Sequence, residues 1–442
     1  MRKISLKQLL LMALFISLCR FGTAQTPFSE DPVAISKIAV AAERSVPKKT
    51  SFWQRLITKI EATFTRLASN ISGKTVSQKL PDFVSRSAAI PGHETREFVC
   101  QGICYLPTQV VSPASKQLET RNYRYLVLSY YPKEEYTSQP SQLVVIDMQT
   151  RKAVRRFSLY VDSDTAYKGH AGGIAAAGKY LWVASGYKLY AFDIQSVLDF
   201  INDKKAAAKS VEGIPASLQL PEKRLAVVKT FAVDTSASFL SFDGNYLWAG
   251  DFVKTSDKNF APVKHHTTNP WKKNTWIAGY KVDANGTPTA TKSYSFVSAG
   301  KSRKVYKPDY LLFCRDSVQG MAVCGDYIAL SVSYGAANSK LAFYRNPIGT
   351  DARKVSFKPE GQKKTFKADA CLLADGENWL KTLELPAGAE DLEYDGRYLY
   401  VTFEGASENY RKKWIAKNPL ISIEGRFYLI SPGMIAGLDA DN

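Results

Sequence analysis

Short apolar runs alternate with turn residues along most of this chain, and one such pattern recurs five times. In the four clear copies, a brief apolar segment meets a glycine-centred turn and a second segment that opens with Tyr-Leu or Tyr-Ile. These copies span 173–183, 239–249, 320–330 and 391–401, and a weaker copy begins at Gly102 and resumes at Tyr125. Glycine supplies the backbone angles that a tight turn between antiparallel strands requires. The pattern therefore predicts a β-hairpin at each of the five places.

Runs of β-branched and aromatic residues after each hairpin predict further strands. We expect third strands at 142–147, 188–193, 275–280, 340–344 and 425–430. We expect fourth strands at 154–159, 226–231 and 292–296, whereas repeat 4 offers two candidates, 353–357 and 380–384. Repeat 5 runs out of chain after its third strand. Its outer strand is therefore expected from the segment before residue 100, for example residues 82–85.

The repeated hairpin resembles the blades of the β-propeller superfamily, and five copies resemble the five-bladed type. The resemblance covers residues 100–442 and implies an all-β fold. Five-bladed propellers include glycan hydrolases and lyases, aminoacyl cyclases and lectin-like binders, often with a site on the central face. The resemblance thus predicts the fold and leaves the function open.

The first 24 residues have the features of a secretion signal, with a basic start, an apolar stretch at 9–18 and a small-residue cleavage site at 22–24. We therefore expect export to the periplasm or the outside of the cell. Cys19 is poorly flanked for lipidation. Residues 25–99 read as a linker that contains an amphipathic helix at about 51–68. That helix either docks on the propeller or contacts a membrane surface through its basic face.

The charge of the chain is strongly positive, with 59 basic and 41 acidic residues and a net charge of +18. Removing the signal deletes Arg2, Lys3, Lys7 and Arg20, which leaves 55 basic against 41 acidic residues, a net charge of +14. Such a balance favours an anionic partner, and we expect an anionic glycan or a phosphate-bearing envelope component, with nucleic acid a weaker candidate. A solvated basic surface with no partner is the alternative.

Five cysteines follow the signal, and an odd number leaves at least one thiol unpaired within the chain. Cys100 and Cys104 lie four residues apart in a predicted strand, which separates them by about 13 Å at ~3.3 Å per residue. They cannot bond to each other while extended, because a disulfide needs Cα atoms within ~7 Å.

Blade geometry predicts which polar residues converge at the channel. Each first strand begins, and each second strand ends, on the same face of the ring. The catalytic candidates on this face are His170, Glu390, Asp391 and Glu404. Candidate ligand-binding residues on the same face or in the loops that open on it are Gln101, Asp251, Trp271, Lys272, Arg315, Gln319, Tyr410, Arg411 and Trp414.

Two functions are compatible with this face. The first is an exported binding module that holds an anionic glycan or phosphate-bearing ligand through basic loops, with Trp271, Trp414 and Tyr410 available for stacking. The second is a hydrolase or lyase that uses Glu390, Asp391 and Glu404 as acid and base or as ligands of a divalent cation such as calcium. His170 would carry protons in the second. Carboxylates that face each other across an open space would favour the enzyme, and carboxylates buried in hydrogen bonds would favour binding or scaffolding.

Overall fold

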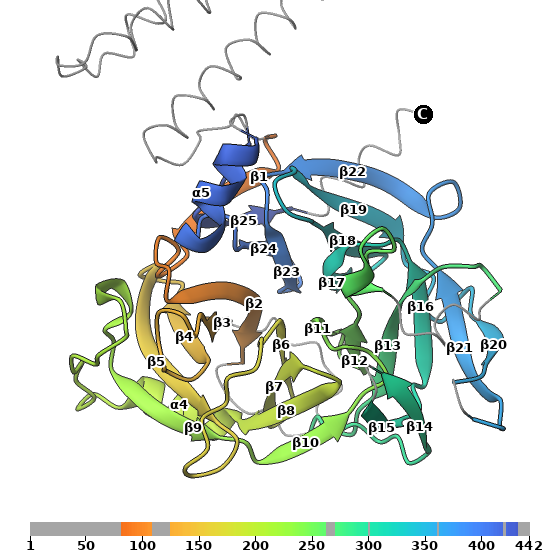
Figure 1. The fold of residues 1–442 in the computed structure, drawn as a ribbon, viewed down its shortest axis with the longest axis horizontal. Helices are drawn as coiled ribbons and strands as arrows, with labels where there is room; N and C mark the ends of the chain where they lie inside the picture. The colour runs from red at the N-terminus through yellow and green to blue at the C-terminus, as the bar shows by residue number, and fades with distance from the viewer. Residues whose placement is uncertain are drawn as a thin grey trace, which may run out of the picture. The chain divides into compact units, whose positions relative to one another are not determined.

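The computed structural model describes residues 81–107, 124–261, 270–298, 301–359, 362–418 and 421–431. Within them, five sheets lie around a common centre, and each places one edge at the middle of the ring (Figure 1). The fold is therefore an all-β, five-bladed propeller, as the repeats predict. The predicted signal and the helix expected at 51–68 lie outside the described residues. In the described part of the chain, no helix is long and apolar enough to cross a bilayer.

The innermost strand of each blade is the first strand of one repeat. These strands contact one another in ring order, and the last returns to the first; they are β2 (Phe98–Leu106), β6 (Gly173–Ala177), β11 (Phe239–Phe242), β17 (Val318–Cys324) and β23 (Ala389–Tyr394). The second strands run antiparallel to them and are β3 (Tyr125–Pro132), β7 (Tyr180–Ser185), β12 (Tyr246–Gly250), β18 (Tyr327–Val332) and β24 (Leu399–Phe403). Tyr180, Tyr246 and Tyr327 open their strands and Tyr398 directly precedes β24, so the predicted equivalence of these tyrosines is confirmed.

The third and outer strands complete each blade. The third strands are β4 (Gln142–Asp147), β8 (Lys188–Asp193), β13 (Thr275–Lys281), β19 (Ser339–Arg345) and β25 (Arg426–Ile430). The fourth are β5 (Lys152–Tyr160), β10 (Lys229–Ala232), β16 (Tyr310–Cys314), β22 (Trp379–Leu385) and β1 (Val84–Ala89). Of the two segments that the sequence offered as the fourth strand of repeat 4, 353–357 and 380–384, the second forms that strand, as part of β22.

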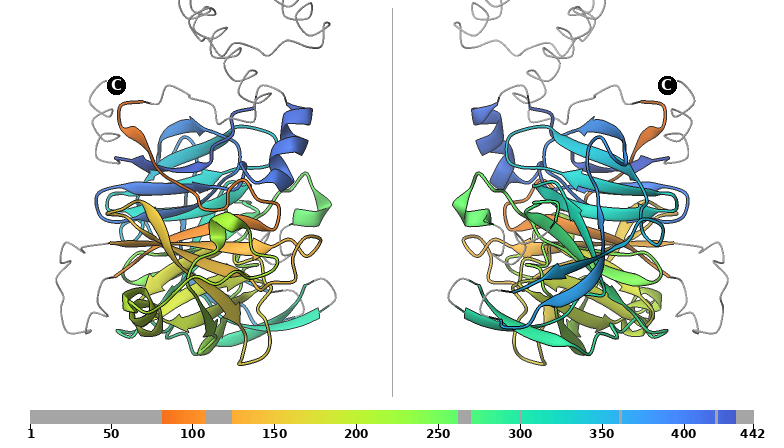
Figure 2. Two further views of the ribbon diagram at one scale, coloured as in Figure 1. Left: turned by 90° about the vertical axis from the view of Figure 1, so that its left-hand side faces the viewer. Right: turned by 90° about the vertical axis from the view of Figure 1, so that its right-hand side faces the viewer.

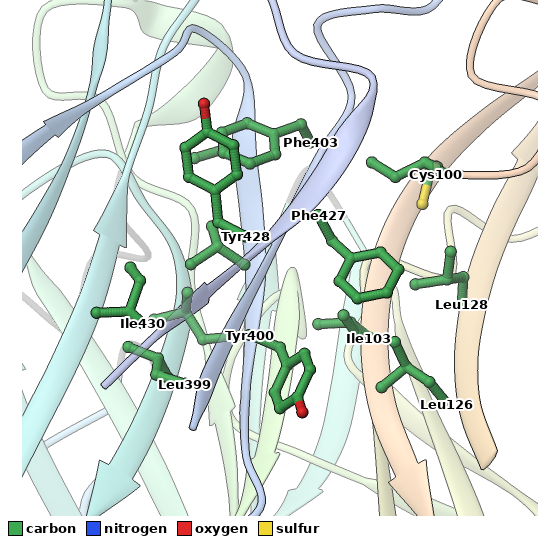
Figure 3. Packing of buried hydrophobic residues seen from close by; sticks show 14 of the residues in the cluster. Cys100, Ile103, Leu126, Leu128, Leu399, Tyr400, Phe403, Phe427, Tyr428 and Ile430 are labelled. Carbon is green, nitrogen blue, oxygen red and sulfur yellow. The ribbon is translucent and has the colours of Figure 1, made fainter. Parts of the chain in front are cut away.

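The ring is closed by β1, which pairs antiparallel with β25 so that Val84 lies opposite Ile430. Arg86 on β1 donates a 2.7 Å hydrogen bond to the buried carboxylate of Glu424, which ties the two ends of the propeller together. Figure 3 shows the apolar core beside this closure, with Phe427 of β25 close to Ile103 of β2. Closure by a strand from before residue 100 agrees with the expectation from the sequence, and it covers the edge that β25 would otherwise expose.

Two predicted fourth strands are wrong in detail. The segment at 226–231 divides, because β9 (Glu222–Ala226) joins blade 1 in parallel with β5 while β10 belongs to blade 2. The segment at 292–296 lies in a separate hairpin of β14 (Ser293–Ser298) and β15 (Lys301–Tyr306). The fourth strand of blade 3 is β16 instead, because its apolar residues can be buried on both faces between β13 and β21 (Phe366–Leu372). The remaining edge strand is β20 (Arg353–Phe357).

Glycines allow the inner strands to approach one another closely. A Cβ on Gly173 would lie 2.1 Å from the backbone nitrogen of Leu240 in the next blade, and one on Gly320 would lie 2.7 Å from the Cα of Asp391. A Cβ on Gly102 would lie 2.7 Å from the Ser129 hydroxyl. The glycines that open three of the repeats therefore serve close packing at the centre of the ring, in addition to the glycines of the hairpin turns.

Helices are few and lie in connections. The helix α4 (Ile194–Asn202) follows β8, and α5 (Glu408–Lys417) follows β24; two short 3₁₀ turns are η1 (Ala216–Leu218) and η2 (Lys258–Phe260). The side views show that α5 and the green turn η2 project from the same face of the ring (Figure 2). That face is the one on which the second strands end, because α5 and η2 lie in loops that follow second strands.

Candidate functional site

Two glutamates of blade 5 meet at the channel mouth. Glu390 lies near the start of β23, and Glu404 directly follows β24, so the antiparallel pair brings them to the same end. Their carboxyl groups hydrogen-bond to each other. Glu390 is only 2% exposed, whereas Glu404 reaches the surface in part. We call these two residues the acid pair.

Two amides from neighbouring blades hold the acid pair in place. Gln101 of β2 donates from Nε2 to Oε2 of Glu404 over 3.0 Å, and Gln319 of β17 donates from Nε2 to Oε1 of Glu390 over 3.2 Å. Blades 1 and 4 flank blade 5, so the pair is clamped from both sides. The sequence predicted that all four residues lie at one mouth, and the structure brings them into direct contact.

Burial and mutual repulsion make the acid pair hold a proton. Burial raises the pKa of Glu390 well above its ordinary value of 4.5, and the nearby Glu404 adds to the effect. Burial also raises the pKa of Glu404, to about 7, although hydrogen bonds from Gln101 and from Glu390 and the charge of Lys133 oppose the rise. Two carboxyls in contact cannot both ionise cheaply. Near neutral pH Glu390 therefore stays protonated and Glu404 is partly ionised, so the pair retains at least one proton and carries at most one negative charge.

An aromatic layer lies beside the acid pair. The hydroxyls of Tyr131 and Tyr410 are 2.7 Å apart, and the Tyr410 hydroxyl also hydrogen-bonds to Glu404. The ring of His170 stacks on Tyr131 with centroids 4.3 Å apart. The ammonium of Lys133 lies 5.0 Å from the ring centre of Tyr131 and 5.5 Å from that of Tyr410. His170 is exposed as a residue, but partial desolvation of its ring against Tyr131 and the charge of Lys133 lower its pKa, so the imidazole is neutral at neutral pH.

Asp391 lies deeper, among the inner strands of three blades. Its Oδ2 accepts hydrogen bonds from the backbone nitrogens of Ile103, at 3.3 Å, and Ile174, at 3.4 Å. The side chain is fully buried, and burial raises its pKa well above the ordinary value. These bonds join blade 5 to blades 1 and 2. Asp391 therefore stabilises the centre of the ring and is not presented to a ligand.

The remaining candidates from blade 3 lie apart from the acid pair. The buried carboxylate of Asp251 accepts a hydrogen bond from the backbone nitrogen of Ser236, within its own blade. The ring of Trp271 packs against Phe313 of the outer strand β16, with centroids 5.2 Å apart. Arg315 follows that same outer strand and hydrogen-bonds to Tyr344, and Lys272 is exposed. Trp271 was expected in a loop over the mouth; its ring packs on the outer strand of blade 3, and residues 262–269 of that loop lie outside the described residues.

Helix α5 supplies Tyr410 to the site and buries Trp414 beneath itself. Trp414 packs with Ala387, Ala406, Ile421 and Ile423, and its ring stacks on Tyr410 with centroids 5.1 Å apart. It therefore supports Tyr410 and offers no free face for stacking. Arg411 lies one residue further along the same helix.

Tyr131 and Lys133 are the site residues that sequence reasoning missed. The second strand of repeat 1 was expected to end at Ser129, whereas β3 continues to Pro132 and so carries Tyr131 to the mouth, with Lys133 directly after the strand. The pattern of apolar residues did extend through Tyr131, and that was the available signal.

Metal ligands do not gather in the described part of the chain, where no group of three or more His, Cys, Asp or Glu side chains could hold an ion. The five cysteines of these residues are all buried, free thiols. The acid pair is surrounded by two amides, two phenol hydroxyls and one ammonium, which allow proton sharing and hydrogen bonding.

Comparison with known proteins adds little to this geometry. No family model and no curated protein sequence matches the chain. Among solved structures, it is similar to the glutaminyl cyclase of Myxococcus xanthus, with 6% identity and a TM-score of 0.34 over 79% of this chain and 97% of that one. A similarity this low carries no argument about the site. The five-bladed fold rests on the strand pairings described above.

Proposed function

We propose that this protein is an exported glycan-binding propeller that binds sugar hydroxyl groups at its channel mouth. The observation that supports this proposal is the acid pair, which retains at least one proton between two carboxyls and is clamped by two amides. The protonated carboxyl and the amide nitrogens can donate hydrogen bonds, and the carboxyl and amide oxygens can accept them. A sugar hydroxyl also donates and accepts, so the two are chemically complementary.

The charge at the mouth favours the uncharged part of a ligand. The acid pair carries at most one negative charge near neutral pH, and Lys133 brings one positive charge beside it. The hydroxyls of Tyr131 and Tyr410 beside the pair add further hydrogen-bond donors and acceptors. The anionic groups that the basic composition predicts would then be bound outside the mouth.

A glycan array with the mature protein tests the proposal. Wild-type protein should bind one class of glycan, and Glu404→Ala should weaken that binding about tenfold or more, because a hydrogen bond to a partly charged group contributes about 1.5–3 kcal/mol. Glu384→Ala, which removes an exposed glutamate on β22, is the matched control and should bind as wild type does. Absence of glycan binding, or equal binding by Glu404→Ala, would refute the proposal.

A second candidate function is acid–base catalysis on a glycan, and the pKa of about 7 for Glu404 favours it. General acid–base groups work best with a pKa near the working pH. Glycosidase carboxylates stand roughly 5–9.5 Å apart across an open site, whereas Glu390 and Glu404 lie close enough for each carboxyl to shift the pKa of the other. Proton abstraction by a lyase therefore fits the pair better than hydrolysis, with neutral His170 available as a proton acceptor.

Glu404→Gln separates the two candidates. The amide still donates and accepts hydrogen bonds, so glycan binding should persist. A lyase would lose turnover in this variant, which can be followed by the ultraviolet absorbance of the unsaturated product from a uronate-containing glycan. Turnover by wild-type protein and none by Glu404→Gln would establish the enzyme, and no turnover by either would leave binding as the function.

A further inference from the structure

Two hairpins that the four-stranded blade plan does not require form one surface at the periphery of blade 3 (Figure 1). One is β14–β15 and the other is β20–β21, which belongs by sequence to repeat 4 but extends blade 3 through β16. Gln362 donates to the carbonyl of Ser295 over 2.7 Å, and Lys307 donates to the carbonyl of Lys367 over 3.0 Å. The hairpins are therefore bonded to each other.

Aromatic residues on the inner faces pack the two hairpins together. Tyr294 lies against Phe366, with ring centroids 4.7 Å apart, and against Phe357, with centroids 5.9 Å apart. Tyr306 stacks on Phe231 of blade 2 at 4.5 Å. All of these rings belong to the hydrophobic cluster of blades 2 and 3. Because the apolar residues face inward, the outward positions are left to polar ones.

Most of the exposed positions on the two hairpins are basic, and the others are Val297, Ser302, Ser356 and Thr365. The described residues 292–298, 301–307, 353–359 and 362–367 contain no acidic residue and eleven basic ones: Lys292, Lys301, Arg303, Lys304, Lys307, Arg353, Lys354, Lys358, Lys363, Lys364 and Lys367. Nine of the eleven are exposed, and Arg303 and Lys307 are half-buried. We call this set the basic wall. Its bordering acid Asp369 pairs with Lys354 over 2.6 Å.

The cations of the basic wall lie close enough to repel one another. Burial lowers the pKa of Lys307, and the charges of Lys292 and Lys354 lower it further. Lysines that guard exposed strand edges against aggregation would explain the charges on β20 and on β15, which belongs to a two-stranded sheet and is also an edge strand. They do not explain Lys363 and Lys364, which lie in the turn between β20 and β21. Asp369, which pairs with Lys354, and Asp309, which acts on Lys307, offset part of this charge, and an anionic partner would neutralise the excess that remains.

We infer that the basic wall is a docking surface for an acidic polysaccharide, separate from the mouth and independent of what the mouth binds. Charge complementarity requires a polyanion with several charges along its length. Nine of the eleven cations are lysines, whose ammonium groups attract negative charge without the two-pronged hydrogen bonding that an arginine offers to one phosphate or carboxylate. The described aromatic rings of the hairpins face inward, whereas single-stranded nucleic acid is bound on exposed aromatic rings. Residues 1–24 are predicted to direct export, to where acidic polysaccharides are abundant.

Binding of a fluorescent heparin oligosaccharide to the full mature chain tests this inference. Wild-type protein should bind heparin at low salt, and the affinity should fall steeply as salt rises, because bound counterions are released on association. Two double variants, Lys301→Glu with Lys304→Glu and Lys363→Glu with Lys364→Glu, should each weaken binding about tenfold, since each charge near the surface contributes roughly 1 kcal/mol or less.

Matched controls make the outcomes distinct. Lys204→Glu with Lys205→Glu reverses two exposed lysines in the loop after α4 and should leave heparin binding within about twofold of wild type. Glu404→Ala should also bind heparin normally, so failure of the mouth proposal and failure of this inference are separable. Melting temperatures verify that each variant is folded.

Four results would overturn the inference. They are no heparin binding, binding unaffected by the hairpin variants, equal loss in the Lys204/Lys205 control, or tighter binding of single-stranded DNA or of phosphatidylserine vesicles than of heparin. Equal loss in the Lys204/Lys205 control would indicate that heparin binding depends only on the net charge of the protein. Tighter binding of DNA or of vesicles would indicate that the partner belongs to another class.

Discussion

The carboxyl group of Glu404 is largely shielded from water, although the residue as a whole is partly exposed at the channel mouth. Its partner Glu390 is buried, so the pair can receive a ligand only through Glu404. The carboxyl of Glu404 retains a proton to about pH 7 because burial penalises its charged form. This residue is therefore where ligand binding and protonation are linked.

Stability should depend on pH through Glu404. Its pKa is about 7 in the folded protein and near the ordinary 4.5 when unfolded, so the folded state holds the proton more tightly. The stabilisation is full below pH 4.5 and is lost as pH rises through 7. Glu404→Gln cannot ionise and escapes this loss. Relative to wild type it should gain on the order of 2–3 kcal/mol in unfolding free energy between pH 5 and pH 8, measured by urea denaturation. A constant difference between the two proteins across this range would contradict the shift.

Asp391 gives a second prediction at the residue scale. Its carboxyl accepts two backbone hydrogen bonds from blades 1 and 2 and is fully buried. Asp391→Ala would leave both nitrogens unpaired and should cost about 2–5 kcal/mol in unfolding free energy. Asp391→Asn keeps an acceptor oxygen of the same shape and should cost clearly less. Equal losses in the two variants, by urea denaturation, would show that the hydrogen bonds contribute little.

At the scale of elements, the sequence predicted the positions of the strands that repeat, but it did not predict how the segments inserted between repeats fold. The glycine turns predicted where the hairpins lie. In one such turn, the side chain of Asp243 accepts hydrogen bonds from the backbone nitrogens of Asn245 and Tyr246. The same logic placed Gln101, Gln319, Glu390 and Glu404 at one mouth. Contacts such as Trp271 on Phe313 depend on how an insertion folds back, which periodicity does not encode. The parallel pairing of β16 with β21 likewise joins two repeats and has no local signal.

The strand β1 should decide the stability of the ring. Deleting residues 25–90 removes β1 and exposes the edge of β25, whereas deleting 25–80 leaves β1 in place. The first deletion should lower the melting temperature by ten degrees or so, since it removes a strand and its ion pair with Glu424, and the second should change it by only a few degrees. Equal melting temperatures for the two truncated proteins in a calorimetric scan would show that closure does not depend on β1.

At the scale of the whole molecule, the basic residues lie mainly on the surface, whereas the thiols of the described cysteines are buried. The basic residues gather in part on the basic wall, away from the near-neutral mouth. The thiols lie inside, and burial raises the pKa of all five described cysteines. A buried thiol of high pKa is a poor nucleophile.

The thiols should therefore be unreactive in the folded protein. We expect a thiol reagent to label none of Cys100, Cys104, Cys314, Cys324 and Cys371 before unfolding and all of them afterwards. A reductant should leave the melting temperature unchanged, because no disulfide joins these residues. A lower melting temperature with reductant, or fewer than five thiols after unfolding, would contradict the packing described.

The account rests on the acid pair, and its ionisation can be measured directly. Carboxyl resonances of the protein labelled with carbon-13 at glutamate side chains can be followed from pH 4 to pH 9. We predict that one resonance titrates with an apparent pKa near 7, that this resonance is absent in Glu404→Gln, and that a second stays protonated to higher pH. Titration of every glutamate near its ordinary value of 4.5 would show that Glu390 and Glu404 do not share a proton, and would remove the basis for a site at the mouth.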